Sequence, residues 1–251
     1  MSELILPPVL VDTGELAQVL KTNGYAILSG SDVAQQAGVL RSDLLQLNRY
    51  WNDLPADAHL KDGGRYRRRR HSCYITRHGD VAPVPHRAHW QPVEYNALHG
   101  GMQRWFEPVS PELGENAAWI SLIRWLGLVC SSLKGEQPWF VEAHQFRIDT
   151  TDGIGRPTPE GAHRDGVDLV AVFLLERQAV KGGETRVFDA AGPAGQRFTL
   201  TDPWSVLLLD DSRIIHESTP IQPADARVPG GHRDTLVLTF RANDFQGISA
   251  T

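Results

Sequence analysis

The chain has 251 residues, of which 41% are hydrophobic and 22% are charged, a composition that excludes disordered and fibrous proteins. Its formal net charge of −5 disfavours a dedicated nucleic-acid or anionic-membrane binder. The two cysteines, Cys73 and Cys130, are too few for a disulfide framework or a thiolate-rich zinc site, which favours the cytoplasm. No secretory signal or long apolar stretch is visible, so we expect no membrane partner.

The first 135 residues are predicted to be largely helical. Apolar residues recur at steps of three and four between Val33 and Trp51, after the candidate N-cap Ser31, which predicts one continuous helix. A shorter helix is expected over 14–21, capped by Thr13, followed by a buried strand over 25–28. The same helical spacing predicts a second long helix over 116–133.

From Trp139 onward the hydrophobic period changes to two, and Gly, Pro and Asp turns separate the segments. The candidate strands are Trp139–Ile148, Asp168–Leu175, Glu184–Phe188, Gln196–Leu200, Trp204–Leu209, Arg213–Thr219 and Arg233–Arg241. Seven short strands without intervening helices predict a sandwich or barrel. We therefore expect an α+β, mainly β protein with a single domain over 1–251, in which a helical and mixed portion (1–135) packs on a β core (136–245).

A candidate metal site begins at His163-Arg164-Asp165, just before an apolar strand. Residues two apart in extended backbone point to the same side, so His163 and Asp165 can converge on one cation. Alone, this triplet is common in a chain with ten histidines. The distant strand residue His216 would complete two histidines and a carboxylate, the facial triad of non-haem Fe(II) oxygenases, for which zinc is the rival metal.

A second constellation follows on the last predicted strand. Arg233 and Thr235 alternate onto one face there, and a guanidinium beside a hydroxyl is suited to bind a carboxylate. The order H-x-D, distal His, then Arg-x-Thr is far more specific than any of its parts.

This ordered set resembles the Fe(II)/2-oxoglutarate-dependent dioxygenases, whose core is a double-stranded β-helix (jelly roll, cupin-like). Within them, the chain is similar to the bacterial family typified by L-isoleucine dioxygenase, which hydroxylates free aliphatic amino acids. The similarity spans roughly residues 20 to 242 and is carried by Leu54–Arg70, Pro159–Gly166, Gly182–Thr185 and Arg233–Phe240.

The resemblance implies a mechanism and its cofactors. His163, Asp165 and His216 would bind Fe(II), and Arg233 with Thr235 would hold the distal carboxylate of 2-oxoglutarate, which chelates the iron by its other end. O2 would be the oxidant, with succinate and CO2 as co-products. The expected partner is a small-molecule substrate, a free amino acid with an aliphatic side chain such as isoleucine, leucine or methionine. No nucleic acid is expected, and the oligomeric state stays open, a homodimer included.

Alternatives remain at this point. A non-catalytic jelly-roll binding protein and a zinc-dependent cupin-type enzyme would both use a similar pocket. A nucleic-acid demethylase or a protein hydroxylase would share the iron chemistry, although the net charge argues weakly against the former.

Further residues are candidates for substrate binding or for support of the metal ligands. The run Arg65–Arg70 fits a solvated segment, a nucleic-acid patch or a pocket wall, and in a strand Arg67 and Arg69 would share one face. Gln145 and Arg147 share a strand face that could line the cavity or form an edge-strand salt bridge, which leaves His144 on the other face as a packed histidine. Glu160 is expected to orient a ligand or cap the loop. The clustered His71, His78, His86 and His89 match no ligand spacing and are interpreted as surface or supporting groups.

Overall fold

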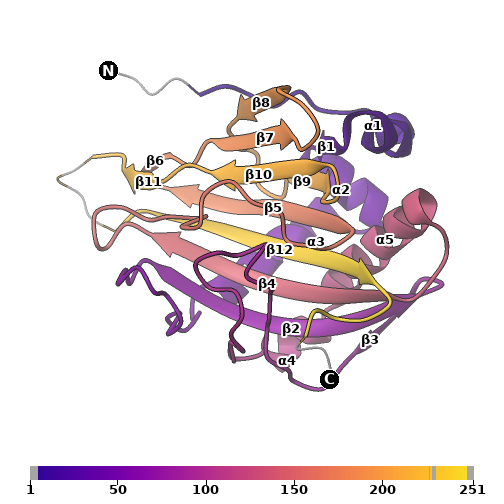
Figure 1. Ribbon diagram of the computed structural model, residues 1–251, viewed down its shortest axis with the longest axis horizontal. Helices are drawn as coiled ribbons and strands as arrows, with labels where there is room; N and C mark the ends of the chain where they lie inside the picture. Colours follow the sequence, from indigo (N-terminus) through magenta and orange to yellow (C-terminus); the bar gives the residue numbers. More distant parts are fainter. Residues whose placement is uncertain (1–4, 226, 228–229, 248–251) are drawn as a thin grey trace.

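The computed structural model describes residues 5–225, 227 and 230–247, and it is built mainly from antiparallel strands (Figure 1). The large sheet has seven strands in the order β1-β9-β5-β12-β4-β2-β3, and two small sheets have the orders β10-β7-β8 and β11-β6. The strands are β1 (Tyr25–Leu28), β2 (Arg67–Arg77), β3 (Asp80–Pro83), β4 (Trp139–Asp149), β5 (Leu169–Gln178), β6 (Val180–Gly182), β7 (Thr185–Asp189), β8 (Gly195–Phe198), β9 (Val206–Asp210), β10 (Ile214–Ser218), β11 (Ile221–Pro223) and β12 (His232–Ala242).

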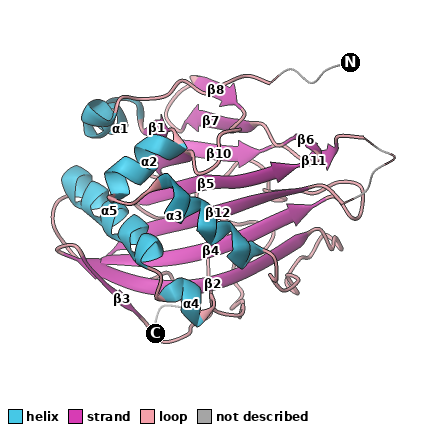
Figure 2. Ribbon diagram, turned by 180° about the vertical axis from the view of Figure 1, so that it is seen from behind, coloured by secondary structure: helices cyan, strands magenta, loops and turns pink. Residues whose placement is uncertain are grey.

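The helices cover one face of the large sheet (Figure 2). They are η1 (Thr13–Glu15), α1 (Leu16–Asn23), α2 (Gly30–Ala37), α3 (Arg41–Gln46), η2 (Leu47–Trp51), α4 (Pro111–Gly114) and α5 (Ala117–Lys134). Helix α5 confirms the predicted second long helix, and the side chain of Asn116 caps its N-terminus. Within the described part of the chain, no helix is long and apolar enough to cross a membrane.

The prediction of one helix from Val33 to Trp51 is wrong. Helix α2 ends at Gly38, whose φ of 69° is left-handed and stops the helical hydrogen bonding. The chain then turns and starts again as α3 and η2, so that Leu40, placed on the apolar stripe by its spacing, is 68% exposed. The N-cap is Ser29 rather than Ser31, and Asp12 rather than Thr13 caps the first helical turn.

Two apolar clusters lie on the two faces of the large sheet. The larger cluster packs the helices against the sheet, and it includes Trp119 of α5, Val141 of β4 and Phe240 of β12. The smaller lies between the large sheet and the β10-β7-β8 sheet and includes Leu174 and Val187. The sheet itself draws β1, β2 and β3 from the first 135 residues, so the two portions of the chain share one core.

The register of the central strands decides which side chains face the interior between the sheets. Residues directly opposite in antiparallel strands share a face. One such row holds Arg67 of β2, Ile148 of β4 and Arg233 of β12. Further rows, reached in steps of two, are Arg69-Phe146-Thr235, His71-His144-Val237 and Cys73-Glu142-Thr239. Most of these residues line the pocket described next.

Candidate active site

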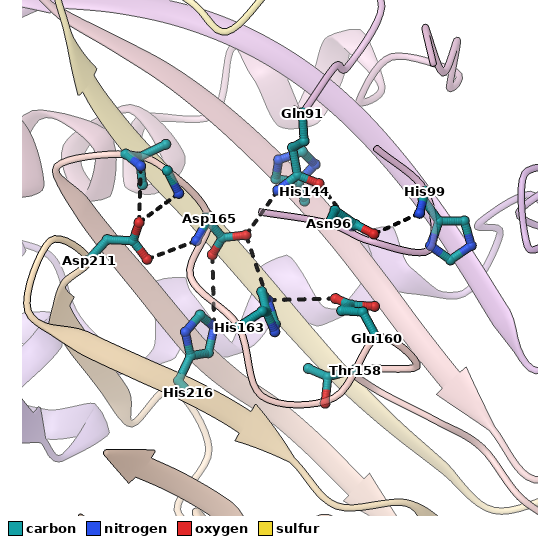
Figure 3. Close-up of polar contacts among 12 residues, drawn as sticks. Gln91, Asn96, His99, His144, Thr158, Glu160, His163, Asp165, Asp211 and His216 are labelled. Carbon is teal, nitrogen blue, oxygen red and sulfur yellow. Dashed lines mark hydrogen bonds and ion pairs between the residues drawn. The ribbon is translucent and has the colours of Figure 1, made fainter. Parts of the chain in front are cut away.

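The structure brings His163, Asp165 and His216 together at the mouth of β5 (Figure 3). His163 and His216 form an antiparallel bridge through their backbones, which places their ring centroids 4.6 Å apart. Each histidine Nε2 lies 3.8 Å from an oxygen of the Asp165 carboxylate. The three candidate donor atoms lie within 4.8 Å of one another.

The hydrogen bonding of these residues fits a metal ion. The Nδ1–H of His163 donates to the carbonyl of Gly161 at 2.9 Å, which leaves the Nε2 lone pair free on the side of Asp165. Burial opposes the charged form of His163, but Asp165 and Glu160 together raise its pKa above the usual value. Burial and His163 lower the pKa of His216 well below its usual value, so this ring is neutral, as a ligand must be. A metal ion bound at His163 would displace the proton that the raised pKa favours, and two histidine nitrogens with one carboxylate suit Fe(II).

Asp211, just after β9, holds the loop that carries Asp165, and the sequence analysis did not identify it. Its carboxylate accepts hydrogen bonds from the backbone N–H groups of Asp165, Gly166 and Val167 at 2.9, 2.7 and 3.0 Å. Burial and the nearby Asp165 raise the pKa of Asp211 to about 7. Three backbone bonds to one side chain fix the direction of the Asp165 carboxylate.

Gln91 supports the same ligand from the loop between β3 and α4. Its side-chain amide donates to Asp165 Oδ1 at 3.1 Å, and its carbonyl accepts from Asn96 Nδ2 at 3.1 Å and Arg104 Nη2 at 2.9 Å. All three supporting side chains are buried. No periodicity marks an irregular loop, so the sequence carried no signal for Gln91, Asn96 or Arg104.

The candidate metal ligands lie in a pocket that is also lined by residues of β2, β4 and β12. At one end of it lie Arg233, which is 3% exposed, and Thr235, which is 4% exposed. Burial and the guanidinium of Arg177 lower the pKa of Arg233 to about 10, because two like charges share a dry site. A carboxylate bound there would relieve this repulsion.

Arg67 and Arg69 lie in the pocket wall, and the remaining arginines of the run face elsewhere. The Nε of Arg67 donates to Asp57 at 2.7 Å. Arg69 is held between two aromatic rings, 3.8 Å from the centroid of Phe106 and 4.4 Å from that of Phe146. Three interpretations were open for the run Arg65–Arg70. The pocket wall is the one that fits Arg67 and Arg69.

Gln145 and Arg147 do not line the pocket, and the salt-bridge alternative describes Arg147. The amide of Gln145 donates to the carbonyl of Tyr50 beneath the helical layer. Arg147 forms two hydrogen bonds with Asp234, at 2.8 and 2.6 Å. The alternate residues of β4 face the cavity, His144 among them, because the helices cover the other face.

Glu160 lies next to the metal-binding residues, with Oε1 3.6 Å from His163 Nε2. Its other oxygen, Oε2, is buried without a hydrogen-bond partner among the described residues. Glu160 lines the pocket and extends between His163 and the loop that carries Asn96 (Figure 3).

A second, fully buried cluster borders the pocket. The Oε2 atom of Glu142 lies 2.5 Å from His89 Nδ1 and 3.4 Å from the Nε2 atoms of His71 and His144. Burial lowers the pKa of all three histidines, His89 to about 4. Arg69 Nη2 donates to His144 Nδ1 at 2.7 Å.

The surface interpretation of these histidines is wrong for His71 and His89, which are buried, and the alternative of a supporting group stays a prediction. His144 is packed as expected, but it faces the pocket rather than the helices. Their spacing gave no signal because they come from β2, β4 and a loop, which meet only in the folded sheet.

Comparisons with known proteins agree with this geometry. The family model described as 2OG-Fe dioxygenase matches residues 48–239. The crystal structure of a bsmA homologue from Methylobium petroleophilum PM1 is 50% identical, covers 98% of this chain and 99% of its own, and superposes with a TM-score of 0.90. Comparison with curated proteins gave no match.

More distant structures share the fold. IDO from Bacillus thuringiensis is 18% identical over 96% of this chain and 100% of its own, with a TM-score of 0.75. The Fe(II)/(alpha)ketoglutarate-dependent dioxygenase TqaL is 22% identical over 91% of this chain and 86% of its own, with a TM-score of 0.69. The family match covers well over half of the chain, so this protein belongs to the 2OG-Fe dioxygenases, enzymes that use Fe(II), 2-oxoglutarate and O2.

Proposed function

We propose that this dioxygenase hydroxylates an unactivated C–H bond of a free aliphatic L-amino acid, such as isoleucine, leucine or methionine. The observation that carries the proposal is one pocket in which the candidate iron ligands lie among both charged and apolar side chains. Val167, Val172 and Val237 give it apolar walls for an aliphatic side chain, while buried arginines and Glu160 offer charges for a polar head group. The sequence resemblance to the L-isoleucine dioxygenase family supports the same substrate class.

We assign the iron to His163, Asp165 and His216, and the distal carboxylate of 2-oxoglutarate to Arg233 and Thr235. The bound iron, together with 2-oxoglutarate and O2, supplies the oxidising chemistry that amino-acid side chains lack. The protein contributes fixed ligand directions and a buried cationic anchor.

Within the pocket, Phe146 and Ile148 lie on β4 beside the assigned anchor and exclude water from it. Thr235 is also fixed from behind, since Trp51 Nε1 donates to its carbonyl at 3.1 Å. We expect the two facing sheets to form the double-stranded β-helix of this enzyme class, acting as a single catalytic domain in the cytoplasm. The two cysteines are free and buried, which is compatible with that compartment.

A coupled succinate assay across the free L-amino acids, with Fe(II), 2-oxoglutarate and ascorbate, tests this proposal. We expect succinate only with aliphatic amino acids, and a product that has gained one oxygen atom by mass spectrometry. Succinate formation with a peptide or a nucleobase, and with no free amino acid, would contradict the substrate class.

An anaerobic titration tests the assigned ligands separately. Fe(II) and 2-oxoglutarate together should give the weak visible charge-transfer band of their chelate, and His163→Ala should abolish it. A variant that keeps the band would overturn the ligand assignment.

A further inference from the structure

The part of the pocket lined by Arg67 and Arg104 contains buried charged groups with unused hydrogen-bonding capacity. Arg104 is 2% exposed, and its Nη2 donates to Gln91, but its Nε has no acceptor among the described residues. Arg67 is 5% exposed, and its Nε donates to Asp57, but its Nη2 has no acceptor in the same part of the chain. An unsatisfied buried donor is costly and uncommon, so each of these atoms indicates a missing acceptor.

The two guanidiniums act on each other. Burial and the charge of Arg67 lower the pKa of Arg104 to about 10, because two like charges lie near each other in a buried site. Both side chains line the pocket, so the acceptor they lack can come from a ligand. Paired guanidinium donors are suited to a carboxylate.

The complementary group is Glu160. Its buried Oε2 has no donor among the described residues, and its side chain extends toward the loop that carries Asn96 (Figure 3). Asn96 and Arg104 both donate to the side-chain carbonyl of Gln91, and Glu160 and Arg104 both line the pocket. A carboxylate oxygen without a donor beside donors without an acceptor indicates a ligand that carries both charges.

The charges of this region balance without a ligand. Three buried guanidiniums face three carboxylates, namely Arg67, Arg69 and Arg104 with Asp57, Glu142 and Glu160. A zwitterion leaves that balance unchanged, whereas a simple monoanion or monocation would leave one uncompensated charge in a dry site.

We propose that Arg104 and Arg67 bind the α-carboxylate of a free amino acid and that Glu160 binds its α-ammonium. The inference rests on the proposed function for the class of substrate, and it adds the residues that recognise the head group. It also makes a free α-amino acid, rather than a residue within a peptide, the ligand that fits, because both charges are lost in peptide bonds.

The test is calorimetric binding to the anaerobic protein loaded with Fe(II) and 2-oxoglutarate. The probes are L-leucine, its des-amino analogue 4-methylpentanoate and its des-carboxy analogue 3-methylbutylamine. We expect leucine to bind at least tenfold more tightly than either analogue, since each analogue leaves one buried charged group without its partner. Equal affinities for all three probes would overturn the proposal, because water would then be satisfying the unpaired atoms.

Two variants test separately which residue binds the α-carboxylate and which binds the α-ammonium. Arg104→Met should weaken leucine binding about tenfold to a hundredfold and remove the preference for leucine over 3-methylbutylamine. Glu160→Gln should remove the preference for leucine over 4-methylpentanoate. If Arg104→Met does not fold, Arg104→Lys keeps the charge but loses the planar fork, and an intermediate loss is expected.

Matched controls remove the same groups outside the pocket. Arg68→Met removes a half-exposed guanidinium from the same strand as Arg67, and Glu107→Gln removes an exposed carboxylate. Both should bind leucine like the wild type. A loss in the controls equal to that in the pocket variants would contradict a specific site.

The binding experiment and the succinate assay fail independently. Binding of leucine with the expected selectivity, but without turnover of any amino acid, would leave the head-group site standing and overturn the proposed function. Turnover of amino acids with unchanged selectivity in both pocket variants would do the reverse.

Discussion

Two clusters of histidines and a carboxylate border the same pocket, but their hydrogen bonding differs. In His163-Asp165-His216, the Nδ1–H of His163 is used by Gly161, which leaves Nε2 free to bind a metal. In the cluster around Glu142, Arg69 donates to Nδ1 of His144, so the proton of this neutral ring is on Nε2 and faces Glu142. The position of one proton, more than the distance between ligands, separates a metal site from a buried hydrogen-bond network.

The charges near the cluster around Glu142 also disfavour a metal ion there. A cation in the second cluster would have to displace the Nε2 proton of His144 beside the buried guanidinium of Arg69. Glu142 already faces ring nitrogens of three histidines, and these contacts and His89 hold its pKa well below the usual value against its burial. We therefore assign the second cluster a role in stability, and the first a role in metal binding.

Asp165→Ala is the largest perturbation of the metal site. Removing a ligand should lower Fe(II) affinity by more than the roughly tenfold to hundredfold lost with an outer partner, and turnover should disappear. Metal content after dialysis and succinate formation measure the two effects. Asp152→Ala, a surface ion-pair partner of Arg65, is the control, and an Asp165→Ala protein with normal iron content would refute the assignment.

Glu142→Gln separates the two clusters most directly. The variant removes the charged acceptor shared by three buried rings, so the free energy of unfolding should fall by about 3 kcal/mol. Urea denaturation measures it, with Glu107→Gln as the control. Iron content should match the wild type, and the loss of a second metal equivalent would show that both clusters bind metal.

Gln91→Leu should have a smaller effect on both iron binding and stability. Asp165 loses one hydrogen bond, and the buried Arg104 and Asn96 lose their acceptor, while Asp211 still holds the loop. We expect Fe(II) affinity to fall about tenfold and the free energy of unfolding to fall by about 1–3 kcal/mol. An unchanged affinity would mean that Asp211 alone is sufficient to orient the ligand.

The smallest expected effect is the contribution of His99 to acid sensitivity. Burial, Arg67 and Arg104 lower its pKa to about 4 from 6.5. Between these values the unfolded chain binds more protons, so stability decreases as the pH falls through this range. At pH 5, His99→Gln should recover on the order of 1–2 kcal/mol of that loss in urea denaturation. An unaltered pH profile would contradict a buried neutral His99.

The candidate metal ligands could be proposed from the sequence because their signal is local. His163 and Asp165 are two residues apart in extended backbone, and Arg233 and Thr235 alternate on one strand, so each pair shares a face whatever the surroundings. Only the proximity of His163 and His216 depends on the tertiary structure. We inferred it from the order of the motifs along the chain.

The wrong assignment of Gln145 and Arg147 has a different cause. Alternation predicts two faces for a strand, but not which face meets the cavity. The polar side chains of Gln145 and Arg147 suggested the face that meets the cavity. The structure has Phe146 and Ile148 lining the cavity, and Gln145 donates to the carbonyl of Tyr50 on the other face. The supporting residues Gln91, Arg104 and Asp211 were missed because hydrogen bonds to a distant loop leave no periodic pattern.

The central position of β12 has a consequence for how the enzyme folds. Strands β4 and β5 flank it and pair with it rather than with each other, so the middle of the large sheet is incomplete until β12 inserts. Its partners come much earlier in the sequence, and such non-local pairing is slow. The residues assigned to 2-oxoglutarate lie on this same strand. Competence to bind 2-oxoglutarate should therefore arise late in folding, together with the closing of the sheet.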